Sequence, residues 1–105
     1  MFSPVLCDHH PAIVLRGDLD FFHKDALLAQ LLPATAWERV TLDLNAVHLL
    51  DASALGCFIH LYNAMREFCP HSLIRLIGVR PQIARLFRLT RVDSLFDLVE
   101  FRKAA

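Results

Sequence analysis

The stretch "VTLDLNAVHLLDASALGCFIHLYNAMR", residues 40–66, contains a strand pattern followed by a helix pattern. From residue 39 to residue 45 apolar and polar side chains alternate, which is the period-2 signature of a β-strand. After a brief apolar connection, large apolar residues return at helical spacing: Leu55, Phe58, Ile59, Tyr62 and Met65. The pattern predicts a helix that ends near Cys69 and Pro70, because proline cannot continue a helix.

Asp51 stands where the strand approach becomes the helix. As an N-cap, its carboxylate can accept hydrogen bonds from the backbone N–H groups of Ser53 or Ala54, and its charge suits the positive end of the helix. Ser53 then falls in the first turn, where exposed backbone donors can accommodate a phosphate, although Asp51 would oppose it electrostatically. From these residues alone, Ser53 is either an ordinary helix start or a regulatory site.

Residues without a large apolar side chain follow Ser53 along the same side of the predicted helix. They are Gly56, Cys57 and His60, one and two turns further on, whereas the large apolar residues lie elsewhere on the helix. A side of this kind lets a kinase or a docking partner approach the Ser53 hydroxyl closely. Any exposed helix end can have this composition, so both interpretations of Ser53 stay open.

Five further elements flank the central strand and helix. The first strand is closed by the turn residues Gly17 and Asp18, and Pro33 stops the helix that follows it. Downstream, Gly78 lets the chain turn at the end of a strand, and Pro81 occupies a favoured first helical position. The predicted elements are a strand over residues 12–17, a helix over 22–32, a strand over 72–79, a helix over 81–89 and a strand over 97–101.

Alternating strands and helices predict an α/β fold. The 105 residues suffice for one domain, residues 1–105, and a content of 55% hydrophobic and 21% charged residues is typical of an ordered globular protein. We expect a central mixed, largely parallel β-sheet of four to five strands, packed by about three to four helices. No apolar run reaches the roughly eighteen residues of a membrane helix, and the N-terminus lacks a signal pattern. We therefore expect no membrane insertion and a cytoplasmic location.

Charge argues against nucleic acid as a partner. Eleven basic and eleven acidic residues give a formal net charge of zero. Positive charge is concentrated in and around the helix predicted over residues 81–89, at Arg80, Arg85, Arg88 and Arg91. Nucleic-acid binding calls for such a patch together with net positive charge or stacking aromatic residues. In a neutral chain, a solvated helix face is the better interpretation.

Cysteine, histidine and serine spacing gives no metal-binding or catalytic pattern. The three cysteines, which lack CxxC spacing, are Cys7, Cys57 and Cys69. The pair His9 and His10 is not part of a His-x3-His pattern with a carboxylate ligand, so we expect reduced thiols and neither metal nor cofactor. Ser53 lies outside a Gly-x-Ser-x-Gly elbow, and the sequence has no glycine-rich phosphate loop. We expect no enzymatic activity.

The central stretch resembles the signature of the STAS family, the anti-sigma-factor antagonists and related modules. In that pattern a V-x-L-D-L strand leads through an apolar loop to D-[ST]-[ST]-G-L-G and a helix. "LRGDLD", residues 15–20, is similar to the family's L-x-G-E-L-D. "LIRLIGVRPQIARLFRLTRVDSLFDL", residues 73–98, resembles its strand, its V-x-P-x-[VI] helix start and its closing leucine–phenylalanine element. The three motifs occur in the family's order and cover nearly the whole chain.

The resemblance implies a small domain that binds a serine kinase which also acts as an anti-sigma factor. The unphosphorylated antagonist binds the kinase and displaces the sigma factor, and phosphorylation of the motif serine weakens that binding. By motif position Ser53 is the acceptor, Asp51 its acidic neighbour and Asp20 the final acid of a turn that helps form the partner surface. The predicted partner-binding residues are Asp18, Asp20, Asp51, Ala54, Gly56, Cys57 and His60.

Two positions depart from the family pattern, since Ala52 lacks a hydroxyl group and Ala54 replaces a glycine. We expect the Ala54 methyl group to narrow the approach to Ser53 or to change which kinase accepts it. STAS modules also act without phosphorylation, so the alternative function is a constitutive subunit of a lipid-transport ATPase complex or of a stress-sensing scaffold. With either function we expect a protein partner, and a chain that is a monomer or a weak dimer.

Overall fold

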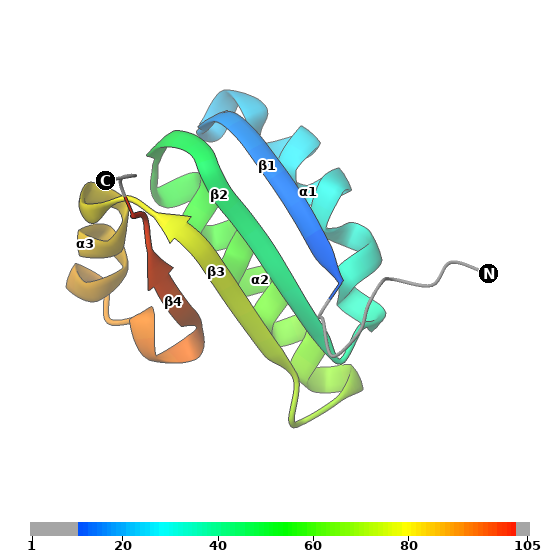
Figure 1. The fold of residues 1–105 in the computed structure, drawn as a ribbon. Helices are drawn as coiled ribbons and strands as arrows, with labels where there is room; N and C mark the ends of the chain where they lie inside the picture. Colours follow the sequence, from blue (N-terminus) through cyan, green and yellow to red (C-terminus); the bar gives the residue numbers. More distant parts are fainter. Residues whose placement is uncertain (1–10, 103–105) are drawn as a thin grey trace.

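The computed structural model describes residues 11–102 and shows strands alternating with helices (Figure 1). The elements, with η for a 3-10 helix, are β1 (Ala12–Leu19), η1 (Phe21–His23), α1 (Lys24–Leu31), η2 (Leu32–Ala36), β2 (Arg39–Leu50), α2 (Ala52–Phe68), β3 (Leu73–Val79), α3 (Pro81–Leu89), η3 (Asp93–Leu95) and β4 (Asp97–Glu100). The expectations for Cys7, His9 and His10 fall outside the described residues.

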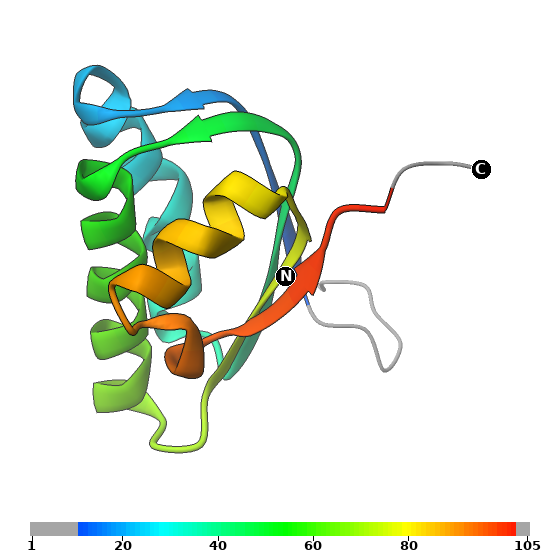
Figure 2. The ribbon, with the colours of Figure 1, turned by 90° about the vertical axis from the view of Figure 1, so that its left-hand side faces the viewer.

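The four strands form one sheet in the order β1-β2-β3-β4, and each neighbouring pair is parallel. Parallel neighbours need a crossover connection, and α1, α2 and α3 lie in the three crossovers. Figure 2 shows these helices on one side of the sheet. The predicted α/β fold is confirmed, and within residues 11–102 the sheet is entirely parallel.

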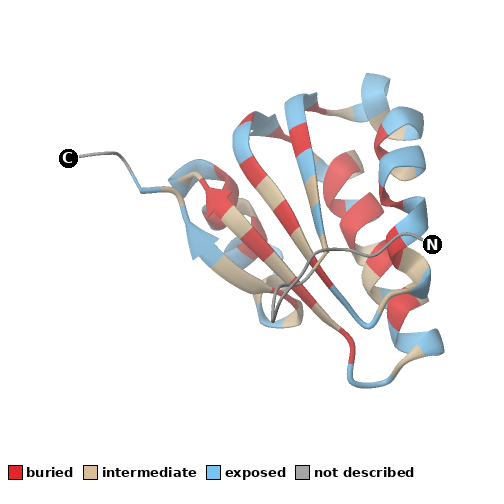
Figure 3. Cartoon of the chain, turned by 45° about the vertical axis from the view of Figure 1, so that its right-hand side comes forward, coloured by how far each residue is buried: buried red, intermediate tan, exposed pale blue. Residues whose placement is uncertain are grey.

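One apolar core lies between the sheet and the helices. In β2, Leu42 and Leu44 are fully buried, whereas Asp43 between them is half-buried. Figure 3 shows this alternation along the strands. Phe58 from α2 and Phe87 from α3 are both fully buried, with ring centroids 6.2 Å apart. The apolar stripe predicted for the central helix therefore faces the sheet and the neighbouring helix.

The α2 and α3 helices agree closely with the sequence patterns. The α2 helix has Asp51 as its N-cap and ends at Phe68, and α3 covers residues 81–89 as predicted. The helix predicted over residues 22–32 is instead divided into η1, α1 and η2. Pro33 accounts for the change from α1 to η2, because it supplies no N–H for an α-helical hydrogen bond. No helix within residues 11–102 has the length and apolar character needed to cross a membrane.

The β2 strand is longer than predicted, because it continues past residue 45 to Leu50. Its register with β1 shifts twice, on either side of Arg16, as happens at β-bulges. Beyond Asn45 the next buried residues are Val47 and Leu50, which are three apart. The alternation that predicts a strand is lost at this point, although the strand itself goes on.

Gly17 and Gly78 lie inside strands and do not form the turns predicted there. Their φ angles are +79° and +69°, in the left-handed region that favours glycine. Each lies where the pairing register of its strand shifts, between Arg16 and Asp18 and between Ile77 and Val79. The two glycines therefore permit bulges, after which the strands continue.

The Asp51 carboxylate joins the start of α2 to the segment that leads into α1. Its Oδ1 accepts hydrogen bonds from the backbone N–H groups of Ser53 (2.9 Å) and Ala54 (3.1 Å), which confirms the predicted N-cap. Its Oδ2 accepts a hydrogen bond from the N–H of Phe21 in η1 (3.1 Å). The Asp51 N–H donates to the carbonyl of Leu19 at the end of β1 (3.0 Å). One residue thus fixes three segments relative to one another.

Two substitutions at Asp51 should destabilise the fold by different amounts. Asp51→Ala removes all three carboxylate hydrogen bonds and should lower the free energy of unfolding by about 2 kcal/mol. Asp51→Asn keeps an oxygen that caps α2 but turns a nitrogen donor toward the N–H of Phe21, so the loss should be about 1 kcal/mol. Urea denaturation followed by circular dichroism measures both losses. Unchanged stability of Asp51→Ala would contradict the role of the carboxylate.

Gly78→Ala should lower the free energy of unfolding by about 1–2 kcal/mol, because φ +69° is unfavourable for a residue with a Cβ. The added Cβ would also overlap the side chain of Asn45, whose Nδ2 donates to Asp43 Oδ1 (2.8 Å). Gly56→Ala is the matched control, since α2 leaves open space there and alanine favours the helix. This control should retain or gain stability in urea denaturation, and equal losses in the two variants would refute the role of Gly78.

Candidate functional site

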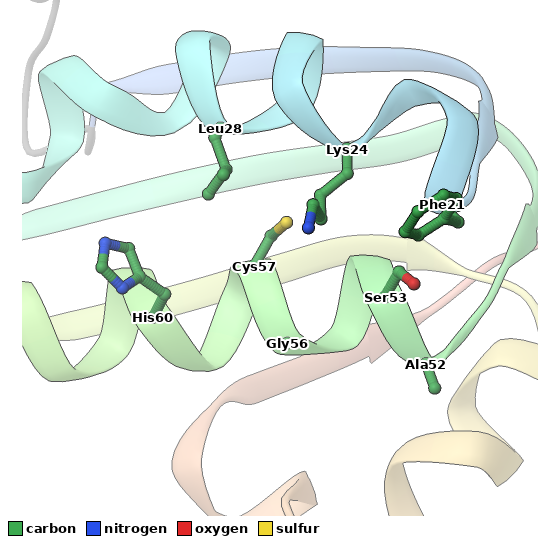
Figure 4. Close-up of a pocket in the computed structure, with 8 residues that line it drawn as sticks. All are labelled: Phe21, Lys24, Leu28, Ala52, Ser53, Gly56, Cys57 and His60. Carbon is green, nitrogen blue, oxygen red and sulfur yellow. The ribbon is translucent and has the colours of Figure 1, made fainter.

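An open groove of about 400 Å³ lies between α2 and the segment formed by η1 and α1 (Figure 4). Because β1 and β2 are neighbours and parallel, the helices that follow them lie side by side on one face of the sheet. Ser53 lies in the α2 wall of this groove. The lining residues are Phe21, Lys24, Leu28, Ala52, Ser53, Gly56, Cys57 and His60.

The α2 wall contains the residues that the sequence placed on one side of the helix. Ser53, Gly56, Cys57 and His60 all line the groove, as their spacing of three, four and seven positions predicts. Gly56 has no side chain and leaves the middle of this wall open, whereas Cys57 is only 4% exposed. In Figure 4 the Ser53 side chain lies on the side of α2 that faces η1, below Phe21. The hydroxyl is therefore presented to the groove and turned away from the core.

The opposite wall is formed by Phe21, Lys24 and Leu28. Phe21 is 62% exposed and the adjacent Phe22 is 87% exposed, so two aromatic rings extend the groove into an apolar surface. The Lys24 ammonium lies over the Phe21 ring, 5.5 Å from its centroid. Figure 4 shows the Lys24 side chain reaching from α1 toward Cys57. This wall combines apolar contact area with one positive charge.

Cys57 is the buried residue among those that line the groove, whereas Ser53 is half-buried and His60 is exposed. Burial raises the pKa of the Cys57 thiol, and the positive charge of Lys24 acts in the opposite direction with a smaller effect. A thiol with a raised pKa stays protonated near neutral pH and is a weak nucleophile. The groove therefore offers apolar contacts, an ammonium group and a serine hydroxyl.

Asp18 and Asp20 do not line the groove. Asp20 Oδ1 accepts hydrogen bonds from the backbone N–H of His23 (3.1 Å) and from its Nδ1 (2.6 Å), which caps η1 and lowers the pKa of the Asp20 carboxyl. Asp20 thus orients η1 and, with it, the aromatic wall of the groove. Asp18 is exposed and borders a separate cavity of about 160 Å³ with Gln30 of α1. Asp18 and Ser53 therefore line different cavities.

The expectation for Ala54 is wrong. Ala54 is completely buried, so its methyl group packs in the core and neither touches a partner nor narrows the approach to Ser53. The physical reason is its position on the helix, where it follows Ser53 by one residue and turns about 100° toward the sheet. Ala52 is the exposed alanine that lines the groove.

Sequence reasoning missed the residues of the η1 and α1 wall. Phe21, Lys24 and Leu28 are three and four positions apart, a spacing that places them on one helical face. The partner of that face depends on which strands pair, which is a tertiary property. The available signal was the aromatic pair Phe21 and Phe22 directly after the "GDLD" motif, since large apolar residues at an exposed helix start are typical of binding surfaces. Within residues 11–102, no group of three His, Cys, Asp or Glu side chains is arranged to hold a metal ion.

Comparisons with known proteins give a matching family and similar folds. The family model described as "Mlab, STAS domain" matches residues 4–100. The crystal structure of the Thermotoga maritima protein TM1081 has a TM-score of 0.71 at 14% identity, covering 85% of this chain and 79% of that one. The NMR structure of TM1081 has a TM-score of 0.68 at 16% identity, with coverages of 95% and 81%.

A third similar structure is that of the anti-sigma factor antagonist SpoIIAA in its unphosphorylated form. Its TM-score is 0.63 at 14% identity, and the alignment covers 96% of this chain and 86% of that one. At 14–16% identity these likenesses show a common fold. The family match covers most of the chain, and the strand, the Asp51 cap and the Ser53 helix are arranged as the sequence motifs require. The chain belongs to the STAS-domain family.

Proposed function

We propose that this protein is an anti-sigma-factor antagonist that binds an anti-sigma factor with serine kinase activity, and that phosphorylation of Ser53 weakens the binding. The single observation that carries this proposal is the position of Ser53 in the wall of an open, largely apolar groove at the start of α2. A modification at this point changes the chemistry of the surface without unfolding the helix. The likeness to SpoIIAA supports the same function.

The groove and the aromatic pair form the proposed partner surface. Phe21 and Phe22 together expose apolar rings next to the groove, and Leu28 adds apolar area inside it. Aromatic residues supply much of the contact area in protein interfaces, where they fill pockets of the partner. Asp51 and Asp20 hold this surface together through their hydrogen bonds to backbone N–H groups in η1 and α2. Their proposed contribution to binding is mainly to position the surface.

A phosphate on Ser53 would oppose binding for two physical reasons. It adds about −1.5 to −2 charges to a surface that has to lose water when a partner covers it. It also lies close to the Asp51 carboxylate, whose Oδ1 is already within 2.9 Å of the Ser53 backbone nitrogen. The released sigma factor would then be recaptured by the anti-sigma factor. Because only protein contacts are involved, the proposed function includes no catalysis by this chain.

A second candidate function is a constitutive subunit of a lipid-transport ATPase complex or of a stress-sensing scaffold. The exposed Phe21 and Phe22 pair favours it, since a permanent interface uses such rings without any modification. Ala52 in place of a hydroxyl residue is compatible with this function as well. The gene neighbourhood discriminates between the two candidates. A kinase or sigma-factor gene favours the switch, and ATPase and permease genes favour the subunit.

Substitutions at Ser53 should separate the two functions. Ser53→Ala should bind the partner protein encoded by the neighbouring gene as tightly as the unmodified protein does. Ser53→Asp should bind it at least about tenfold more weakly, a loss of about 1.4 kcal/mol in binding free energy. Isothermal titration calorimetry with the purified partner measures both affinities. Ser94→Asp is the matched control, because Ser94 is exposed in η3, outside the groove. Equal affinities of Ser53→Ala and Ser53→Asp for the partner would contradict the phosphorylation switch and favour the constitutive subunit.

A further inference from the structure

One ammonium group, that of Lys24, lines the same groove as the Ser53 hydroxyl. Lys24 is the only lysine or arginine among the residues that line the groove. Within residues 11–102 its ammonium makes no ion pair and lies over the ring of Phe21, 5.5 Å from the centroid. Figure 4 shows the Lys24 side chain reaching toward Cys57, one turn along α2 from Ser53. Among the described residues, a cation without an ion pair therefore lines the groove that a phosphate on Ser53 would enter.

Two of the backbone donors at the start of α2 are already occupied by the Asp51 carboxylate. Asp51 Oδ1 accepts from the N–H groups of Ser53 and Ala54, and Oδ2 accepts from the N–H of Phe21. The N–H groups of Ser53 and Ala54 are donors that an anion at the start of α2 would otherwise use. The Asp51 carboxylate also repels a phosphate through its own charge. Positive charge from outside α2 would therefore stabilise a phosphate on Ser53.

We infer that Lys24 is the counter-ion of a phosphate on Ser53, and that this ion pair draws the lysine stem across the groove and closes it to a partner. The inference rests on the proposed phosphorylation of Ser53 and specifies how that phosphorylation acts. The flexible stem of a lysine can turn from the Phe21 ring toward the phosphate without backbone movement. A charge-assisted hydrogen bond to phosphate is stronger than a cation–π contact at an exposed ring. Occlusion of the groove then adds to charge repulsion.

Other charged groups surround the space between Lys24 and Ser53. Asp51 lies at the start of α2 and Asp25 follows Lys24 on α1, and both oppose a second negative charge on the phosphate. His60 lines the groove further along α2. Histidine side chains commonly change charge between pH 5 and 8. A titration of the phosphoserine in this range is therefore carried out in a protein that lacks the His60 imidazole. His60→Gln supplies this background.

The test uses protein in which phosphoserine is inserted at residue 53 during translation, so that no kinase is required. A ³¹P NMR titration at an ionic strength of about 0.1 M, where the Debye length is about 10 Å, measures the second pKa of the phosphoserine, which is about 6 in a free peptide. Lys24→Met keeps the apolar stem and removes the charge, and it should raise this pKa by about 0.5 pH unit. Lys24→Arg should retain the lower value. Arg66→Met is the matched control, because Arg66 lies about 20 Å further along α2 and outside the range of unscreened charge.

A second measurement follows the movement of the lysine. In the unphosphorylated protein, nuclear Overhauser effects should connect the Lys24 methylene protons with the Phe21 ring, and in the phosphoserine protein with the Cβ protons of residue 53. Equal phosphoserine pKa values in the parent and the Lys24→Met protein, or Lys24 contacts that stay with Phe21, would overturn the inference. Neither result depends on whether a kinase modifies Ser53 in the cell. A Ser53 that is never phosphorylated in the native host would reject the proposed function separately.

Discussion

The three hydrogen bonds accepted by the Asp51 carboxylate are the constraint on which the site depends. They cap α2 through the N–H groups of Ser53 and Ala54, and they fix η1 through the N–H of Phe21. A single side chain therefore sets the relative positions of both walls of the groove where Ser53 is presented. The same carboxylate occupies two of the donors that a helix start would offer to an anion, and its charge offsets the positive potential there. Asp51 therefore positions Ser53 and also raises the energy of placing a phosphate on it.

The groove itself follows from the topology of the sheet. Since β1 and β2 are parallel neighbours, α1 and α2 must lie together on the face that both crossovers cover. Leu27 and Leu31 of α1 are buried, which leaves Lys24 and Leu28 facing the groove. Gly56 on α2 supplies no side chain to fill the gap. A partner can therefore contact the groove without disturbing the core, and a change at Ser53 can alter binding while leaving the fold intact.

The sequence predicted the elements whose signals are local. Pro81 predicted the start of α3 correctly, and Asp51 predicted the cap and the direction in which α2 presents Ser53. The end of β2 was not predictable from alternation, because the bulges beyond Asn45 change the spacing of buried residues. The role of Ala54 was also misjudged, since an alanine fits a core and a surface equally well and only the packing decides. Lys24 was missed because the spacing of residues within one helix does not show which other helix packs beside it.

The most direct test of the central claim, that Ser53 is a phosphorylation switch in a protein-binding groove, is a mass measurement on the protein purified from its native host. Intact mass and fragment mapping are compared before and after phosphatase treatment. The account predicts a fraction of the protein that carries one phosphatase-sensitive phosphate, located on Ser53. A protein that is unmodified under all growth conditions and is recovered in a constant complex with transporter or scaffold subunits would contradict it.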